Sequence, residues 1–525
     1  MSRGGWRHCA DDSHAGSIGI MLRASMTLDP GSVVSPVRRR TFGSFVEHLG
    51  RCVYTGIFEP GHPKADDQGF RADVAELVRE LGVSTIRYPG GNFVSGYRWE
   101  DGVGPVETRP RRLDLAWHSL ETNAFGTNEF VAWARAQGVE PMMAVNLGTR
   151  GIQEALDLLE YCNVREGSAL ASLRRSHGAL EPHGVRMWCL GNEMDGPWQL
   201  GHKTATEYGR LAAETARAMR MIDPDLVLVA CGSSGSGMPT FGEWERTVLD
   251  LAYDEIDMIS AHAYYEEKDG DRTSFLASAV DMDHFIDTVA GIADEVKLAK
   301  GGTKDIAISF DEWNVWYITR PESEVPKSEW PQAPRLLEDV HTATDAVVVG
   351  GLLISLLRHS DRVHAASLAQ LVNVIAPIMT DPGGDAWRQA TFHPFSLTSR
   401  YARGDVLDAA VESPRHATER FGEVASVDAV ATCDREAGAG TVFVVNRDPS
   451  EPIELTVGAA GLGGLVGAEG TIIGGADGDA KNTSREPDRV APRALDVLRE
   501  GSRLTITLPP ASWAMIRIDC GPRAA

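Results

Sequence analysis

Between Phe42 and about Leu371, short apolar runs with the composition of β-strands alternate with longer amphipathic or alanine-rich segments. A strand buried on both faces and followed by a helix is the repeating unit of a parallel sheet. Eight such runs are present, at residues 42–47, 84–88, 141–146, 186–192, 226–231, 258–262, 306–312 and 363–370. Eight strands close a (β/α)8 barrel, so the sequence predicts an α/β protein of TIM-barrel type. An open doubly wound sheet is the competing topology.

Helix candidates fill the intervals between these runs. They cover residues 66–81, 127–137, 151–162, 204–222, 282–299 and 338–359. Gly82 and Gly138 follow the first two candidates directly. Glycine often ends a helix in a left-handed conformation, so both positions are expected to be helix C-termini.

After about Phe395 the pattern changes to strands with two-residue alternation, as at 441–446, 453–457, 503–508 and 512–518. Such alternation is typical of antiparallel sheets with one buried face. We expect a disordered leader at 1–25, an N-terminal strand at 26–40 that joins the second domain, the barrel at 41–394, and a jelly-roll-like antiparallel β-sandwich at 395–525. The glycine- and aspartate-rich stretch at 461–479 is expected to be a mobile loop.

The charge and the apolar patterning restrict the partners. The formal net charge is -23, and nucleic-acid affinity comes mainly from lysine and arginine, so no nucleic acid is expected. No apolar run approaches the roughly 18 residues that a membrane span needs. The first 25 residues lack the apolar core of an export signal. These features predict a cytoplasmic protein with no membrane partner.

Polar residues gather at the C-terminal ends of the predicted strands, the face of a (β/α)8 barrel that carries catalysis. Glu193 and Glu312 are the sharpest pair, because each ends an apolar strand, and strands four and seven face one another across the barrel. Acetal hydrolysis needs one carboxyl group to protonate the leaving oxygen and another to attack the anomeric carbon or to steer water to it. A separation of about 5 to 5.5 Å would make the second group a covalent nucleophile.

Four neighbouring residues receive supporting interpretations. Asp311 is expected on the opposite face of its strand from Glu312, because side chains alternate along a strand. His262 is expected to hydrogen-bond behind the site rather than to donate a proton. Arg87 either orients a carboxylate or forms a structural ion pair. Gly90 and Gly91 are expected to form a tight turn that presents the side chain of Asn92.

Four stretches, at 42–51, 87–97, 191–199 and 311–314, resemble the α-L-arabinofuranosidases of glycoside hydrolase family 51. The likeness runs from about Thr27 to Arg517. Many retaining barrel glycosidases share an Asn-Glu pair like Asn192-Glu193, so the Arg-Tyr-Pro-Gly-Gly-Asn run that starts at Arg87 is what narrows the resemblance to this family.

The resemblance implies an exo-acting, retaining enzyme that releases terminal non-reducing α-L-arabinofuranosyl groups from arabinan, arabinoxylan or derived oligosaccharides. It implies that Glu193 is the acid/base and Glu312 the nucleophile, in agreement with the strand argument. It also implies that no metal or other cofactor is used and that the protein is a homo-oligomer, often a hexamer. Sugar-binding roles are implied for Glu47, Asn92, Trp117, Asn192, Tyr264, Trp316 and Gln370.

Physical chemistry supports three of these roles. Asn192 can hydrogen-bond the sugar hydroxyl next to the anomeric carbon. Tyr264 can donate to Glu312. Glu47, taken as ionised, would accept from a sugar hydroxyl. For Trp117 and Trp316, simple core packing is the alternative.

Two rival functions stay open at this stage. One is another retaining barrel glycosidase, such as a β-xylosidase or an endo-β-glucanase, since the fold and the carboxylate pair do not fix the sugar. The other is a non-catalytic carbohydrate-binding protein.

Overall fold

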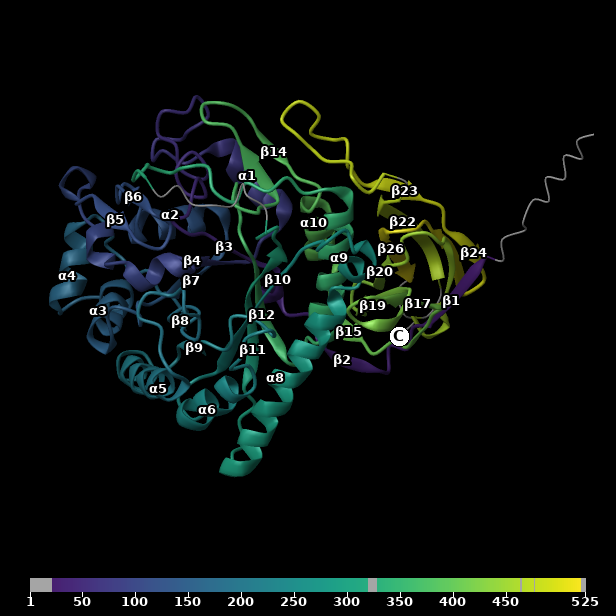
Figure 1. Cartoon of the computed structure of the whole chain (residues 1–525), viewed down its shortest axis with the longest axis horizontal. Helices are drawn as coiled ribbons and strands as arrows, with labels where there is room; N and C mark the ends of the chain where they lie inside the picture. The colour runs from purple at the N-terminus through teal and green to yellow at the C-terminus, as the bar shows by residue number, and fades with distance from the viewer. Residues whose placement is uncertain (1–20, 320–327, 463–464, 476, 521–525) are drawn as a thin grey trace, which may run out of the picture.

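The computed structural model describes residues 21–319, 328–462, 465–475 and 477–520, and it contains a closed parallel barrel beside a β domain (Figure 1). The barrel strands are β3 (Gly43–Phe45), β4 (Thr85–Tyr88), β7 (Glu140–Ala144), β8 (Met187–Leu190), β9 (Val227–Ala230), β10 (Met258–Tyr265), β11 (Ala307–Val315) and β12 (Val363–Leu368). They pair in this order, and β12 pairs in parallel with β3. The predicted closed barrel is therefore confirmed, and the open doubly wound sheet is wrong.

Six barrel helices overlap the predicted segments. They are α1 (Ala72–Leu81), α2 (Thr127–Gln137), α3 (Ile152–Asn163), α5 (Ala205–Ile222), α8 (Ala279–Lys300) and α9 (Ala343–Arg358). Gly82 and Gly138 adopt φ of 80° and 69° and end α1 and α2, as predicted. The described residues contain four further α-helices that were not predicted: α4 (Ala169–Ser176), α6 (Glu243–Ala252), α7 (Arg272–Leu276) and α10 (Phe392–Tyr401).

The β domain consists of two facing sheets. One contains β1 (Leu22–Thr27), β16 (Val411–Glu412), β21 (Ile453–Gly458), β24 (Leu498–Glu500) and β25 (Arg503–Leu508). The other contains β2 (Val33–Pro36), β15 (Asp405–Leu407), β19 (Val427–Asp434), β20 (Ala439–Asn446), β22 (Leu465–Gly474), β23 (Arg493–Leu495) and β26 (Ser512–Cys520). Their inner apolar side chains form one core cluster. The predicted β-sandwich is confirmed, with β1 and β21 as a parallel pair among otherwise antiparallel strands.

Helix α9 joins the two domains. It lies between the barrel and the sandwich, and nearly all of its residues are buried (Figure 1). Gly350 allows a close approach, because a Cβ atom there would lie 2.2 Å from the indole of Trp513 in β26. The two domains therefore pack through an apolar helix.

The N-terminal segment differs from the prediction. Its first strand, β1, begins at Leu22 rather than at residue 26, because Ala24 and Met26 both bury their side chains in the sandwich core. β1 lies inside its sheet, between β16 and β21, whereas β2 forms the edge of the other sheet. The segment thus contributes a strand to each sheet. Residues 1–20 of the expected leader lie outside the described residues.

The expected mobile loop at 461–479 is also a correction. Within it, β22 is a ten-residue strand that pairs with β26 almost along its whole length. Its main-chain hydrogen bonds hold the strand in place although it has few large side chains, which is why a composition rich in glycine misled the prediction.

Three separate two-stranded antiparallel sheets lie among the described residues: β5 (Arg112–Asp114) with β6 (Ser119–Glu121), β13 (Ile378–Thr380) with β14 (Ala386–Arg388), and β17 (Arg415–Thr418) with β18 (Gly422–Ala425). The β17–β18 hairpin of the C-terminal domain is fastened to barrel helix α7, where the backbone N–H of Arg420 donates to Ser274 Oγ at 3.0 Å. Among the described helices, none is both long and apolar enough to cross a membrane.

Candidate active site

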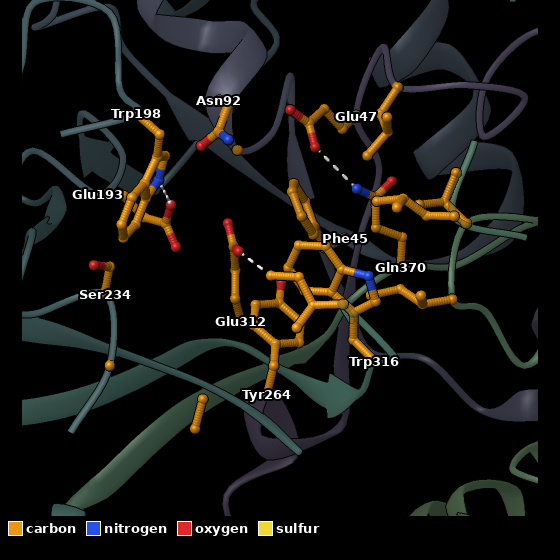
Figure 2. A pocket seen from close by; sticks show the side chains of 18 of the residues that line it. Phe45, Glu47, Asn92, Glu193, Trp198, Ser234, Tyr264, Glu312, Trp316 and Gln370 are labelled. Atoms are coloured by element: carbon orange, nitrogen blue, oxygen red, sulfur yellow. Dashed lines mark hydrogen bonds between the residues drawn. The ribbon is translucent and has the colours of Figure 1, made fainter. Parts of the chain in front are cut away.

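A pocket of about 750 Å³ opens at the C-terminal ends of the barrel strands (Figure 2). Eight of the nine residues proposed from the sequence line it: Glu47, Asn92, Trp117, Glu193, Tyr264, Glu312, Trp316 and Gln370. Asn192 lies behind the wall and is almost fully buried. It accepts from Arg87 Nη2 at 2.6 Å and donates to Asn92 Oδ1 at 3.3 Å.

Glu193 and Glu312 come together from opposite parts of the barrel. Glu193 follows the end of β8 and Glu312 lies in β11. Three atoms all lie within 4.8 Å of one another: a carboxylate oxygen of Glu193, a carboxylate oxygen of Glu312 and a ring nitrogen of His262. Carboxyl groups whose oxygens approach this closely fit a retaining glycosidase, whose paired groups lie about 5 to 5.5 Å apart, better than an inverting one.

Glu312 is held by three side chains. Arg87 Nη1 donates to its Oε1 at 2.7 Å, and the Tyr264 hydroxyl donates to its Oε2 at 2.8 Å. His262 Nδ1 lies 3.5 Å from the same Oε2. Burial raises the pKa of Glu312, and the positive charges of His262 and Arg87 oppose that rise. Arg87 thus makes the carboxylate contact that the orienting interpretation requires, and its orienting role stays a prediction.

Asp311 does not lie where strand alternation placed it. Its Oδ1 is 3.0 Å from His262 Nε2, and its Oδ2 is 3.6 Å from Arg87 Nε, so it faces the barrel interior together with Glu312. The cause is a bulge in β11. Ser309 pairs with Ser260 but Glu312 pairs with His262, so β11 has one extra residue at this point. A bulge interrupts the alternation of faces.

Glu193 is held by two nitrogen atoms. Trp198 Nε1 donates to its Oε2 at 2.7 Å, and His262 Nδ1 lies 3.0 Å from its Oε1. Burial would lower the pKa of His262, but the nearby carboxylates Glu312, Asp311 and Glu193 raise it well above its ordinary value. The raised pKa favours the imidazolium form of His262. Its hydrogen bonds to the carboxylates agree with the hydrogen-bonding role expected from the sequence.

Glu47 lies on the other side of the pocket. It accepts from the backbone N–H of Phe93 at 2.9 Å, from Trp117 Nε1 at 2.7 Å and from Gln370 Nε2 at 2.9 Å. Burial raises its pKa to about 8, against the effect of the first two of these hydrogen bonds. The sequence predicts an ionised Glu47, whereas the raised pKa favours its protonated form at neutral pH.

The predicted turn at Gly90 lies beside Glu47. Gly90 has a φ of 106°, and a Cβ atom on it would lie 2.5 Å from the Cβ of Glu47. The next residue, Gly91, leaves the space in which the oxygens of Glu47 and Glu312 approach the backbone. The turn leads directly to Asn92, the first residue of a short 3-10 helix.

Several residues at the pocket had no role assigned from the sequence. Trp198 hydrogen-bonds Glu193, and Phe45 and Ser234 line the wall. Trp198 lies in the same motif as Glu193, which was the available signal. Trp117 and Trp316 both line the pocket and also pack against the barrel core. Trp316 meets Tyr264 edge to face at 5.0 Å.

One group of side chains has ligand atoms close enough together to hold a metal ion: Glu193, His262 and Glu312. Both ring nitrogens of His262 already lie within hydrogen-bond distance of carboxylates. A protonated imidazole offers no lone pair to a metal. This group is better described as a network of hydrogen bonds, and the absence of a cofactor stays a prediction.

Comparison with known proteins identifies the family. Residues 77–287 match the family model "Alpha-L-arabinofuranosidase 1 domain", and residues 311–512 match "Alpha-L-arabinofuranosidase C-terminal domain". An "Intracellular exo-alpha-(1->5)-L-arabinofuranosidase" of Streptomyces lividans is 60% identical over 95% of this chain and 75% of its own length. An "Exo-alpha-(1->6)-L-arabinofuranosidase" of Bifidobacterium longum is 53% identical over 97% of this chain and 100% of its own length.

The chain belongs to the α-L-arabinofuranosidases of glycoside hydrolase family 51. The solved structure of a family 51 α-L-arabinofuranosidase from Bifidobacterium longum superposes with a TM-score of 0.91 at 50% identity and covers 95% of this chain and 100% of that one. The predicted resemblance is confirmed: the chain is a retaining α-L-arabinofuranosidase. Glucosidase and glucanase–xylanase structures at 12% and 14% identity share only the fold, so the rival glycosidases are not favoured.

Proposed function

We propose that this α-L-arabinofuranosidase acts at the non-reducing end of neutral arabinose-containing oligosaccharides, with Glu312 as nucleophile and Glu193 as acid/base. The observation that carries this assignment is the pair of carboxylates within 4.8 Å of each other in one pocket. The hydrogen bonds to the two groups distinguish their roles. Among the described residues, His262 lies close to both groups, but only Glu312 is also paired with an arginine, Arg87, which favours a carboxylate able to attack.

In the first step, an oxygen of Glu312 attacks the anomeric carbon of the arabinofuranosyl group. The bond from that carbon to the leaving oxygen breaks, and Glu193 transfers its proton to that oxygen. Tyr264 and Arg87 hold Glu312 in position by hydrogen bonds to its two oxygens. The product of this step is a sugar esterified to Glu312.

In the second step, a water molecule attacks the same carbon and gives its proton to Glu193. The ester bond to Glu312 breaks and its carboxylate is restored. Two displacements on opposite faces return the sugar to its original configuration.

The sugar itself is proposed to bind on the Glu47 side of the pocket. Gln370 Oε1 is buried at the pocket and has no hydrogen-bond partner among the described residues, so it can accept from a sugar hydroxyl. Protonated Glu47 can donate to another. Asn92 offers its side-chain amide, and Asn192 supports it from behind the wall by a hydrogen bond. The rings of Trp117, Tyr264 and Trp316 shape the remaining walls.

The named relatives support α-(1→5)-linked arabinan oligosaccharides as substrate. Those from Streptomyces lividans and Bacillus subtilis, 60% and 50% identical, are both named exo-α-(1→5)-L-arabinofuranosidases. They are also named intracellular, which supports a cytoplasmic location for this chain. Arabinoxylan fragments and arabinan itself are the other candidate sources of terminal groups.

We also propose that the protein binds neither nucleic acid nor membrane and that it forms a homo-oligomer. The formal net charge of -23 opposes binding to nucleic acid and to anionic membrane surfaces. A homo-oligomer, of hexamer size, rests on the family resemblance alone. Light scattering coupled to size-exclusion chromatography measures it directly.

Azide rescue tests the two catalytic assignments. With an aryl α-L-arabinofuranoside as substrate, Glu312→Ala should lower kcat on the order of 10⁴-fold or more, and added azide should give the β-L-furanosyl azide, of inverted configuration. Glu193→Ala should instead give the α-L-furanosyl azide, because azide then intercepts the ester at Glu312. Glu243→Ala, at an exposed carboxylate of α6, is the control and should match the wild type. The opposite pattern of azide products would exchange the two roles.

A further inference from the structure

The pocket is larger than its sugar-binding side requires. Its volume of about 750 Å³ lies within the range of clefts that take ligands of drug size, whereas a single pentosyl group is much smaller. Three of the residues proposed to hold the arabinofuranosyl group, Gln370, Glu47 and Asn92, follow β12, β3 and β4, which are neighbouring strands of the barrel. Space on the other side of the pocket is therefore left for a second part of the substrate.

That other side is formed after β8, β9 and β10, which are also neighbours in the barrel. Figure 2 shows Trp198, Glu193 and Ser234 together on one side of the pocket, with Glu47 and Gln370 on the other and Glu312 between them. The acid must reach the leaving oxygen, so the leaving group has to lie on the Glu193 side. Trp198 exposes 53% of its surface there and offers a flat apolar face.

Beyond Trp198 the wall carries polar side chains from four separate elements. They are Ser236 after β9, Glu266 and Lys268 after β10, Asp281 in the first turn of α8, and Arg420 in the turn of the β17–β18 hairpin. Asp281 accepts from Ser236 Oγ at 3.2 Å and from the Tyr265 hydroxyl at 3.1 Å, which fixes this part of the wall.

Two of these side chains have unused hydrogen-bonding capacity. Glu266 is 8% exposed, and its Oε1 has no hydrogen-bond partner in the described part of the chain; the nearest cation is Lys268 Nζ at 3.9 Å. The guanidinium of Arg420 lies over the ring of Phe421 at 5.1 Å and makes no hydrogen bond or salt bridge with any described residue. A buried carboxylate oxygen without a donor is costly, and a bound hydroxyl would satisfy it.

We propose that this side of the pocket, formed by Trp198, Glu266 and Arg420, binds the leaving group as a neutral oligosaccharide of at least two sugar units. Trp198 packs against the first unit, and Glu266 and Arg420 hydrogen-bond hydroxyls of the second. The proposal rests on the proposed function and extends it. Because Arg420 belongs to the C-terminal domain, the β-sandwich takes part in selecting the substrate through one hairpin.

Chain-length kinetics test the proposal. The substrates are an aryl α-L-arabinofuranoside, α-(1→5)-arabinobiose and α-(1→5)-arabinotriose, whose leaving groups contain no sugar, one sugar and two sugars. Arg420→Ala should lower kcat/KM for the triose about tenfold, mainly through KM, because a hydrogen bond from a charged group is lost. The aryl substrate and the biose, which do not reach Arg420, should change less than about twofold by the same reasoning.

Arg415→Ala is the matched control, because Arg415 lies on the same hairpin, is exposed, and bonds only the backbone oxygen of Glu423 among the described residues. It should leave all three substrates unchanged. Arg420 is exposed, so its replacement should not alter Tm. An equal loss on all three substrates, or a wild-type enzyme with no preference for the triose over the biose, would overturn the inference. Failure to cleave even the aryl substrate would instead refute the proposed function.

Discussion

Single residues at the pocket behave according to their burial as much as their chemical type. Glu193 and Glu312 could be predicted because each ends an apolar strand, and strand ends converge in a barrel. The role of Trp198 was not predicted: it lies in the same motif as Glu193, but in a loop whose path no strand or helix pattern specifies. The sequence did not reveal the raised pKa of Glu47. Burial raises that pKa to about 8, and the burial comes from several elements that are far apart in the sequence.

The raised pKa of Glu47 predicts a pH-dependent stability difference. Between its ordinary pKa of 4.5 and about 8, the folded protein keeps a proton that the unfolded chain releases. Stability contributed by this group is therefore lost as pH rises through that window. Glu47→Gln removes the effect, so Tm of the variant minus Tm of the wild type should increase from pH 5 to pH 8.

Differential scanning fluorimetry of both proteins across this range checks the prediction. Glu107→Gln, at an exposed carboxylate, should show a constant difference from the wild type. A constant difference for Glu47→Gln as well would mean that Glu47 is ionised in the folded protein.

At the scale of elements, the barrel strands were predictable and their irregularities were not. The eight strands are continuous apolar runs, and the main helices have amphipathic faces and glycine ends. The bulge in β11 cannot be recognised from the apolar pattern of the sequence, because an extra residue in an apolar strand changes the pairing register without changing the composition. β22 was missed for the opposite reason, since its pairing comes from main-chain groups.

The bulge in β11 makes Asp311 a positioning residue. Asp311→Asn keeps the shape of the side chain and removes its charge, which should lower the pKa of His262. A buried hydrogen bond to a charged group is worth about 1.5–3 kcal/mol, so kcat should fall about tenfold or more. Steady-state kinetics and an NMR titration of the His262 ring measure the two effects.

Asp305→Asn changes an exposed carboxylate ahead of the same strand and should alter neither value. If Asp311→Asn lowers kcat but leaves the titration of His262 unchanged, Asp311 acts on strand structure and not through the imidazolium.

For the whole molecule, the junction between barrel and sandwich combines an apolar helix with an ion cluster. Arg358, at the end of α9, donates to Asp283 of α8 at 2.9 Å and also bonds Asp428 of β19. Asp428 keeps only 10% of its side chain exposed. One arginine therefore neutralises carboxylates from both domains.

Arg358→Ala should leave these carboxylates without their main cation. Breaking a fully buried pair costs about 3–5 kcal/mol, but Arg358 itself is 35% exposed, so we expect a loss of roughly 2 kcal/mol in unfolding free energy after allowance for solvent screening. Guanidinium denaturation measures it. Arg246→Ala, in an exposed pair with Glu295, should cost less than about 1 kcal/mol. Equal costs would show that the cluster adds nothing beyond a surface pair.

The two strands of the N-terminal segment impose an order on biosynthesis. β1 pairs in parallel with β21, with Leu22 opposite Ile453, and β2 pairs with β15. Both partner strands follow the barrel in the sequence. On the ribosome, these first strands emerge long before their partners exist. The barrel can close before β1 and β2 have their partner strands, and the sandwich assembles only at the end of translation. Pairing between strands that are far apart in the sequence is slow. The last step of folding therefore brings the strands that are synthesised first to those that are synthesised last.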